Sequence, residues 1–370
     1  MKVLIISCTT GEGHNSCARA IKEIFDLNNE PCDISDGLSF ISPSLSKFAE
    51  IGHIILYRHF PKIFNLGYSL SEKNPSFFAP GSIVYKIFSK GTLKLKNYIL
   101  ENGYDAVICT HPFAAVILTE MQNRYKLSIK TAFVATDYTR CPSVEDSALD
   151  YYFIPDKKLC DEFVCKNITP DKIYPFGIPI KQKFYNELSK NEAKEKLGIL
   201  PENRHIVMMC GSMGCGPLSS LAAAVSQNMN SNTELTVICG TNNKLKNALE
   251  NTCGKLSNVH ILGFTNDMPT VLARADLYLT KPGGISTTEA AIKKIPMLFV
   301  NTVAACETYN LAHFTEYGVA YYGRNVKDLK AKCLGMINDS HTLDEISLKL
   351  NEIEKINSAE KIREILKRDA

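Results

Sequence analysis

Two glycine-rich turns are the first features of this sequence that could carry out chemistry. Apolar runs at 205–210 and 275–279 are each followed by glycines, in the turns 211–217 and 282–284. Each turn leads into a segment of helical periodicity, so free backbone N–H groups and the positive end of a helix dipole face the turn. Such a turn can bind phosphate, because glycine lets a bulky anion approach the backbone closely.

The composition of these turns leaves an alternative open, since an ordinary strand-to-helix connection also contains proline and glycine. Neither turn is a P-loop, because no Gly-Lys-Ser/Thr follows the glycines. Glu289 lies about one helical turn beyond 282–284, where a carboxylate can meet a sugar hydroxyl beside a bound anion. The pair of turns therefore predicts phosphate binding without identifying the ligand.

A histidine after the first predicted strand is the third candidate. The apolar run 1–8 is followed by Gly11-Glu12-Gly13-His14 and by a predicted helix at about 16–27. The third glycine of the dinucleotide-binding fingerprint is missing, so that motif is weak here. Open α/β sheets bind ligands at the carboxyl ends of their strands, and imidazole titrates near neutral pH. His14 is therefore a candidate general base, and a helix-capping or turn residue is the alternative.

Polar residues also follow two later strands of the first half. His111 follows the run 106–110, and Asp137 follows the run 131–136. Each could be a simple cap, but with His14 they make three polar side chains at one predicted sheet edge. We expect them to share a ligand-binding cleft.

The elements that must position these residues alternate between strands and helices in both halves. A charged segment at 179–198 separates the two series and resembles a hinge with a lead-in helix. The sequence therefore predicts an α/β protein of two doubly wound domains that face each other across a cleft. A charged amphipathic pattern at 344–368 predicts a final helix that packs onto the body.

The segment 43–102 differs in character from the rest. Its cationic residues outnumber its glutamates and alternate with aromatic residues; they are Lys47, Arg58, Lys62, Lys73, Lys86, Lys90, Lys94 and Lys96. This mixture suits an anionic membrane surface, where rings enter the interface and cations meet head groups. Nucleic acid would use the same ingredients, and a helical insertion with a solvated basic face is the plainest alternative.

Composition excludes several classes of protein. A net charge of +3 over 370 residues is too small to indicate nucleic acid by itself. The 13 cysteines form no CxxC pair, which favours a reducing cytoplasm over a disulfide framework or a zinc site. No apolar run approaches the length of a signal peptide's core or a membrane span, so we expect any membrane contact to be peripheral.

The order of the motifs resembles one family along nearly the whole chain. The motifs are 11–16, Thr136-Asp137-Tyr138, 176–180, 263–268, 275–290 and 307–310. Together they resemble the monogalactosyldiacylglycerol synthases and processive diacylglycerol glucosyltransferases. More distantly, the chain is similar to the peptidoglycan enzyme that adds N-acetylglucosamine to lipid I.

This resemblance implies a GT-B fold, with two Rossmann-like domains across a cleft. Residues 1–180 would form the acceptor and membrane-facing domain and 181–370 the nucleotide-sugar domain, with the last helix, about 344–368, returning to the first. Such enzymes invert the anomeric centre without a metal or other cofactor, and the donor would be a UDP-hexose. If the roles of the matching family residues apply here, the catalytic residues would be His14 and Asp137. The donor-binding residues would be Gly13, Ser212, Met213, Gly214, Phe264, Thr265, Met268, Pro282, Gly283, Gly284, Ile285, Glu289, Glu307 and Asn310.

Each group of donor residues has an implied role. The residues from Phe264 to Met268 would flank the nucleobase, and Glu289 would bind the ribose. The glycine turns, through 212–214 and 283–285, would hold the diphosphate, whereas Glu307 and Asn310 would contact the sugar.

Three positions depart from the family pattern. Cys306 stands where the lipid glycosyltransferases usually have a glutamine, and Cys141 and Val144 stand where a histidine and a tryptophan are common. Because of these changes, the motifs do not determine the identity of the sugar or of the acceptor.

The leading hypothesis is transfer of a hexose to diacylglycerol on the inner face of the cytoplasmic membrane, which the segment 47–98 would contact, with no nucleic-acid partner. The alternatives are a polyprenyl-linked saccharide or secondary-metabolite acceptor, and a non-catalytic nucleotide-sugar-binding protein.

Overall fold

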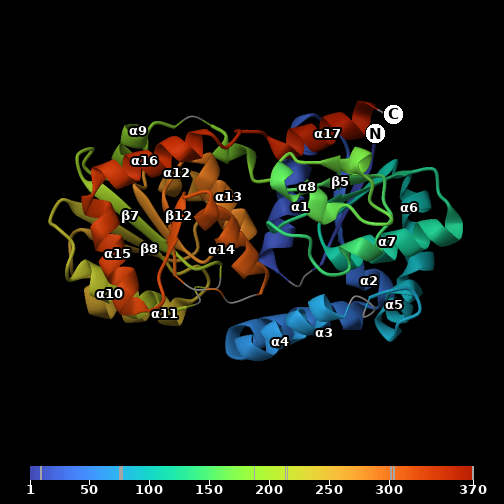
Figure 1. Cartoon of the computed structure of the whole chain (residues 1–370), viewed down its shortest axis with the longest axis horizontal. Helices are drawn as coiled ribbons and strands as arrows, with labels where there is room; N and C mark the ends of the chain where they lie inside the picture. The colour runs from blue at the N-terminus through green and yellow to red at the C-terminus, as the bar shows by residue number, and fades with distance from the viewer. Residues whose placement is uncertain are drawn as a thin grey trace. The chain divides into compact units, whose positions relative to one another are not determined.

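The structure is a computed structural model that describes residues 1–8, 11–74, 78–186, 188–212, 214, 216–300, 302 and 305–368. The side chains of residues 50, 53, 54, 57–59, 61, 62 and 64 lie outside this description. The chain divides into two compact units (Figure 1). Unit 1 comprises Met1–Gln182, Ala304–Tyr309 and Ile356–Ala370, and unit 2 comprises Lys183–Val303 and Asn310–Lys355.

Unit 1 is built on a parallel sheet with the order β2-β1-β3-β4-β5-β6. Its central strands are continuous apolar runs because helices cover both faces of a parallel sheet. The chain passes from β1 outward to β2 and then returns to β3 on the other side of β1, so the strand order reverses between β1 and β3. The strands are β1 (Val3–Ser7), β2 (Cys32–Asp36), β3 (Ala106–Cys109), β4 (Lys130–Val134), β5 (Tyr151–Phe153) and β6 (Ile173–Tyr174).

The helices of unit 1 include a long excursion between β2 and β3. They are α1 (Glu12–Leu27), α2 (Gly37–Ile41), α3 (Pro43–His59), α4 (Pro61–Lys73), α5 (Ile83–Phe88), α6 (Thr92–Asn102), α7 (Pro112–Tyr125), α8 (Cys160–Phe163) and α17 (Ser358–Arg368). Helix α1 begins at Glu12, earlier than the expected start near residue 16, so His14 lies in its first turn.

The residues of the basic and aromatic segment 43–102 fall into a buried group and an exposed group. Phe78, Tyr85 and Phe88 belong to the core of unit 1, and the rings of Phe78 and Phe88 stack with centroids 6.5 Å apart. Helices α3 and α4 instead expose apolar side chains at the spacing i, i+3, i+7 of one helical face: Phe48, Ile51 and Ile55 on α3, and Ile63, Leu66 and Leu70 on α4. The exposed apolar surface of this segment is therefore concentrated on α3 and α4, and part of the aromatic set forms ordinary core.

Unit 2 is built on a second parallel sheet, with the order β12-β11-β10-β7-β8-β9. Counted within the unit, this is the 3-2-1-4-5-6 order of a dinucleotide-binding sheet read from its far edge, and the order reverses between β7 and β10. Its strands are β7 (Arg204–Met209), β8 (Thr233–Ile238), β9 (Val259–Leu262), β10 (Leu277–Thr280), β11 (Met297–Phe299) and β12 (Ala320–Tyr322). Its helices are α9 (Lys190–Glu195), α10 (Leu218–Ser226), α11 (Asn243–Cys253), α12 (Met268–Ala273), α13 (Gly284–Ile292), α14 (Cys306–Glu316, whose first turn is grouped with unit 1), α15 (Val326–Asn338) and α16 (Ser340–Asn351). The prediction of two doubly wound α/β domains is confirmed.

The expected single helix over 344–368 is wrong. The segment forms α16 and α17, which are separated by residues 352–357 and grouped with different units. The spacing of apolar residues continues through the break because both helices bury one face. The helices themselves are separate, and Asn357 and Ser358, at the start of α17, are hydrogen-bonded to residues of unit 1.

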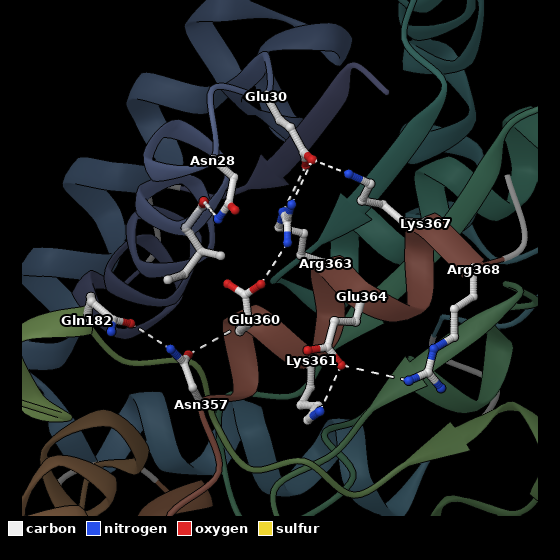
Figure 2. Close-up of polar contacts among 11 residues, drawn as sticks. Asn28, Glu30, Gln182, Asn357, Glu360, Lys361, Arg363, Glu364, Lys367 and Arg368 are labelled. Atoms are coloured by element: carbon white, nitrogen blue, oxygen red, sulfur yellow. Dashed lines mark hydrogen bonds and ion pairs between the residues drawn. The ribbon is translucent and has the colours of Figure 1, made fainter.

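Helix α17 is attached to unit 1 through both faces. Its buried side chains are Ala359, Ile362 and Leu366, and the helix packs beside α1. On the polar side, Glu30 accepts hydrogen bonds from Nε and Nη2 of Arg363 at 3.0 and 2.9 Å and from Nζ of Lys367 at 2.5 Å (Figure 2).

The two ends of α17 are also bonded to unit 1. Ser358 Oγ donates to the Phe176 carbonyl at 2.7 Å, and Lys130 Nζ donates to the Leu366 carbonyl at 2.6 Å.

The ion pairs of α17 also affect the titration of Glu30. Burial acts to raise the pKa of Glu30, but the hydrogen bonds from Arg363 and Lys367 hold this pKa below its usual value.

Candidate functional site

The candidate site of unit 1 is centred on the His14 imidazole. Its Nδ1 lies 2.7 Å from the Thr110 carbonyl oxygen and 2.9 Å from Thr136 Oγ1. A carbonyl oxygen can only accept, so Nδ1 must carry the proton. In the neutral ring the lone pair is then on Nε2, which is the tautomer that a general base needs.

A second histidine packs against the first. The rings of His14 and His111 have centroids 4.5 Å apart and are tilted by 60°. His111 caps helix α7, because its Nδ1 accepts a hydrogen bond from the Phe113 N–H at 3.1 Å. The neutral His111 ring therefore carries its proton on Nε2 and has the opposite tautomer to His14.

The third contributor to this cluster comes from the loop after β4. Thr136 is buried and bonds His14, whereas Asp137 is half-buried next to it. Asp137 is a residue that the sequence predicts for the site, whereas the contacts of Thr110 and Thr136 with His14 come from the structure. The sequence contains a pattern that could have indicated both threonines, since each is a polar residue at or near the carboxyl end of a predicted strand.

The topology of unit 1 explains why these residues meet. His14 follows β1, Thr110 and His111 follow β3, and these strands are neighbours on either side of the point where the strand order reverses. At such a point the loops of the two strands diverge to opposite faces and leave a crevice, where α/β sheets place their ligands. The predicted shared edge for His14 and His111 is thus present in the structure.

The corresponding reversal in unit 2 is occupied by the two glycine turns. The first glycine loop (211–217) follows β7 and the second glycine loop (282–284) follows β10, and β7 and β10 are paired in the sheet. Met213 and Cys215 of the first loop lie outside the described residues.

The first glycine loop packs backbone to backbone against the turn after β8. Thr241 N–H donates to the Ser212 carbonyl at 2.9 Å, and Gly240 has a φ of 58°. A β-carbon on Gly240 would lie 2.0 Å from the Ser212 carbonyl oxygen, so this contact requires glycine on both conformational and steric grounds. Asn242 Nδ2 also donates to the Gly214 carbonyl at 3.3 Å.

The second glycine loop is held by its own turn and by a side chain from α14. Gly283 N–H donates to the Lys281 carbonyl at 2.8 Å, and Asn310 Nδ2 donates to the Pro282 carbonyl at 2.9 Å. Asn310 is fully buried, so in this structure it supports the turn. Gly284 and Ile285 open helix α13, whose unsatisfied N–H groups are available to an anion.

The remaining predicted donor residues lie at several places. Phe264 is 64% exposed in the loop after β9, followed by Thr265, whose Oγ1 accepts from the Asp267 N–H, and by Met268 at the start of α12. Glu289 lies in α13 and is half-buried, whereas Glu307 is buried in the first turn of α14 and Gly13 is exposed in the first turn of α1. Their assigned roles stay predictions.

The side chains and helices of the described part of the chain bear on metals and membranes. No group of three or more His, Cys, Asp or Glu side chains is arranged there to hold a metal ion. Within the same residues, no helix combines the length and the apolar character that crossing a membrane requires.

Two Rossmann-like units, each with candidate binding residues where its strand order reverses, form the architecture of the GT-B class. Comparison with known proteins gives the same class. Residues 14–180 match the monogalactosyldiacylglycerol (MGDG) synthase family, and residues 205–368 match the glycosyltransferase family 28 C-terminal domain. The two matches together extend from residue 14 to residue 368 and confirm the resemblance that the sequence motifs predicted.

Individual proteins extend the comparison over most of the chain. A processive diacylglycerol beta-glucosyltransferase from Staphylococcus saprophyticus is 28% identical over 327 residues, which cover 87% of this chain and 80% of that protein. The fold is similar to that of Acinetobacter baumannii MurG, with a TM-score of 0.64 and 14% identity over 100% of both chains. It is also similar to the Neisseria meningitidis UDP-GlcNAc 2-epimerase bound to UDP-GlcNAc, with a TM-score of 0.62 and 13% identity over 99% of both chains.

Proposed function

We propose that this protein transfers a hexose, with glucose as the first candidate, from its UDP derivative to the hydroxyl of diacylglycerol at the cytoplasmic face of a membrane. The observation that carries the proposal is the His14 imidazole, whose Nδ1–H is held by the Thr110 carbonyl. The name of the Staphylococcus saprophyticus relative supports diacylglycerol as acceptor and glucose as sugar.

The proposed reaction is a single displacement with inversion. The acceptor oxygen forms a bond to the anomeric carbon, the bond from that carbon to the diphosphate oxygen breaks, and UDP leaves. His14 Nε2 takes the acceptor's hydroxyl proton as the new bond forms, and this transfer contributes about 10²–10⁴-fold to the rate. Unit 1 thus supplies the base.

Unit 2 would supply the leaving-group side of the reaction without a metal ion. The negative charge that develops on the diphosphate would meet backbone N–H groups of the two glycine loops and the positive end of the α13 dipole. Phe264, which is exposed beside the loop after β9, has a ring face available for the uracil base.

Helices α3 and α4 would supply the membrane contact. Each exposes a stripe of apolar side chains, among which Phe48 is 76% exposed and Leu66 is 60% exposed. Water-exposed stripes of this kind lower their free energy when they enter the interface between head groups and acyl chains. The cations of the segment 47–98 would add attraction to anionic lipids.

The activity test uses the purified chain, UDP-glucose or UDP-galactose, and diacylglycerol vesicles, with product read by mass spectrometry. His14→Ala should lose about 10²–10⁴-fold in kcat, whereas His341→Ala, at a histidine whose side chain is 82% exposed, should match the wild type. Full activity in the His14 variant refutes the assignment of the base. Absence of any glycolipid, with a positive result for a polyprenyl-linked acceptor, transfers the proposal to that acceptor. NMR of the anomeric proton and addition of EDTA test inversion and metal independence.

The membrane contact is tested separately by vesicle flotation. Leu66→Ser combined with Ile63→Ser should reduce the bound fraction, and Leu348→Ser, at an equally exposed leucine of unit 2, should leave it unchanged. Equal flotation of the two variants contradicts the role of α4.

A further inference from the structure

The residue immediately before the second glycine loop is a lysine whose side chain lies beside both glycine loops. Lys281 is half-buried at the end of β10. A β-carbon built on Gly211 would lie 2.9 Å from Lys281 Cε and 3.7 Å from Nζ. A β-carbon built on Gly283 would lie 3.8 Å from the same Cε and 4.0 Å from Nζ.

These distances place the ammonium group next to the backbone of the first glycine loop and the second glycine loop at once. The two loops come from the paired strands β7 and β10, so the position of Lys281 follows from the register of the sheet. Gly211 has a φ of 70°, a conformation that favours glycine, and its missing side chain leaves the space that the lysine methylenes occupy.

A positive charge at this position has a specific chemical use. Two backbone loops and a helix dipole offer N–H groups and partial charges, whereas the leaving diphosphate of a nucleotide sugar carries full negative charge. A lysine ammonium is a compact cation with three donors and binds phosphate oxygens as a point charge. A half-buried cation is also screened less by salt than an exposed one.

We infer that Lys281 binds the diphosphate of the donor and stabilises the charge of the departing UDP. This inference rests on the proposed function, because it assigns the ligand of the two glycine loops. It adds a full cation to the backbone groups, and it makes Lys281 a residue that contacts substrate in the reaction.

The test compares ligands that differ only in the diphosphate. UDP binding is measured by calorimetry and uridine binding by ligand-observed NMR, for the wild type, Lys281→Met, Lys281→Arg and Lys327→Met. Lys327 is an exposed lysine of α15 and serves as the matched control. Hydrogen bonds to charged groups contribute enough that Lys281→Met should weaken UDP binding about 10- to 100-fold.

The expected results and the results that would overturn the inference are distinct. The inference predicts unchanged uridine binding in Lys281→Met, partial recovery of UDP binding in Lys281→Arg, and wild-type behaviour in Lys327→Met. Equal UDP affinity in the wild type and Lys281→Met overturns the role of Lys281 and leaves the proposed function standing. Loss of uridine binding together with UDP binding also overturns it, because the lysine would then support the fold of the loops. If the wild-type protein binds no UDP, the proposed function itself fails.

Discussion

The ion pair between Glu30 and Arg363 should control how firmly α17 is attached to unit 1. The two side chains are only 12% and 15% exposed, and the guanidinium makes two hydrogen bonds to the carboxylate. Arg363→Met removes both bonds and a third one, from Nη1 to Glu360 at 2.7 Å, but it leaves Lys367 on Glu30, so the loss should be smaller than three full charge-assisted bonds. We expect a decrease of about 2 kcal/mol in the free energy of unfolding of unit 1.

The matched control is Lys361→Met on the same helix. Its ion pair with Glu364 is 45% and 35% exposed, and a pair of that exposure contributes about 0.5 kcal/mol. Urea unfolding followed by circular dichroism measures both variants, and hydrogen exchange of the α17 amides reports local detachment. The reasoning is refuted if Arg363→Met and Lys361→Met differ by less than about 0.5 kcal/mol, the contribution expected of an exposed pair.

The same ion pair predicts a pH dependence. The folded state lowers the pKa of Glu30 from its ordinary 4.5, so the unfolded chain binds this proton more readily. The stabilisation is therefore complete above the unfolded pKa and is lost as the pH falls through the folded pKa. The difference between the wild type and Arg363→Met should shrink below pH 4.5; a constant difference down to pH 3 contradicts this account.

Three further outcomes follow from other parts of the fold. Thr136→Val keeps the shape of the side chain but removes the oxygen near His14 Nδ1, so kcat should fall about tenfold, the value of one hydrogen bond, with little change in KM for the donor; an equal rise in KM would contradict a role in orienting the base. Gly240→Ala should abolish or severely reduce soluble folded protein, since its β-carbon would meet the Ser212 carbonyl; a variant with the wild-type Tm would refute this. Burial lowers the pKa of His205 well below 6.5, so the neutral ring favours folding and stability should decline as the pH falls below 6.5; His205→Asn should weaken that decline in urea unfolding, and an unchanged pH profile would count against it.

The central elements of both sheets could be predicted from the sequence because their residues are buried on both faces. Strands such as β1 and β10 are continuous apolar runs, and the glycines follow them directly. The strands β2 and β12 could not be predicted, because two residues of each are exposed and neither gives a continuous buried run.

The contacts of the candidate site could be predicted only in part. The position of His14 after a strand was visible, and the topology then brought His111 to it. The partners of its Nδ1, Thr110 and Thr136, depend on which carbonyl and which hydroxyl face the ring after packing. The spacing of apolar residues in the sequence does not show which groups will face the ring. For the same reason, the position of Lys281 beside Gly211 required the pairing of β7 with β10.

The attachment of α17 to unit 1 determines which unit contains the two chain ends. Residues 183–303 and 310–355, which form unit 2, lie between the three segments of unit 1, and both described chain ends belong to unit 1. A truncation after α16 would therefore leave unit 2 whole, but it would remove a segment of unit 1 and uncover the face of α1 that packs on α17. A fluorophore or tether at either end would likewise report on unit 1 and leave the glycine loops of unit 2 unlabelled.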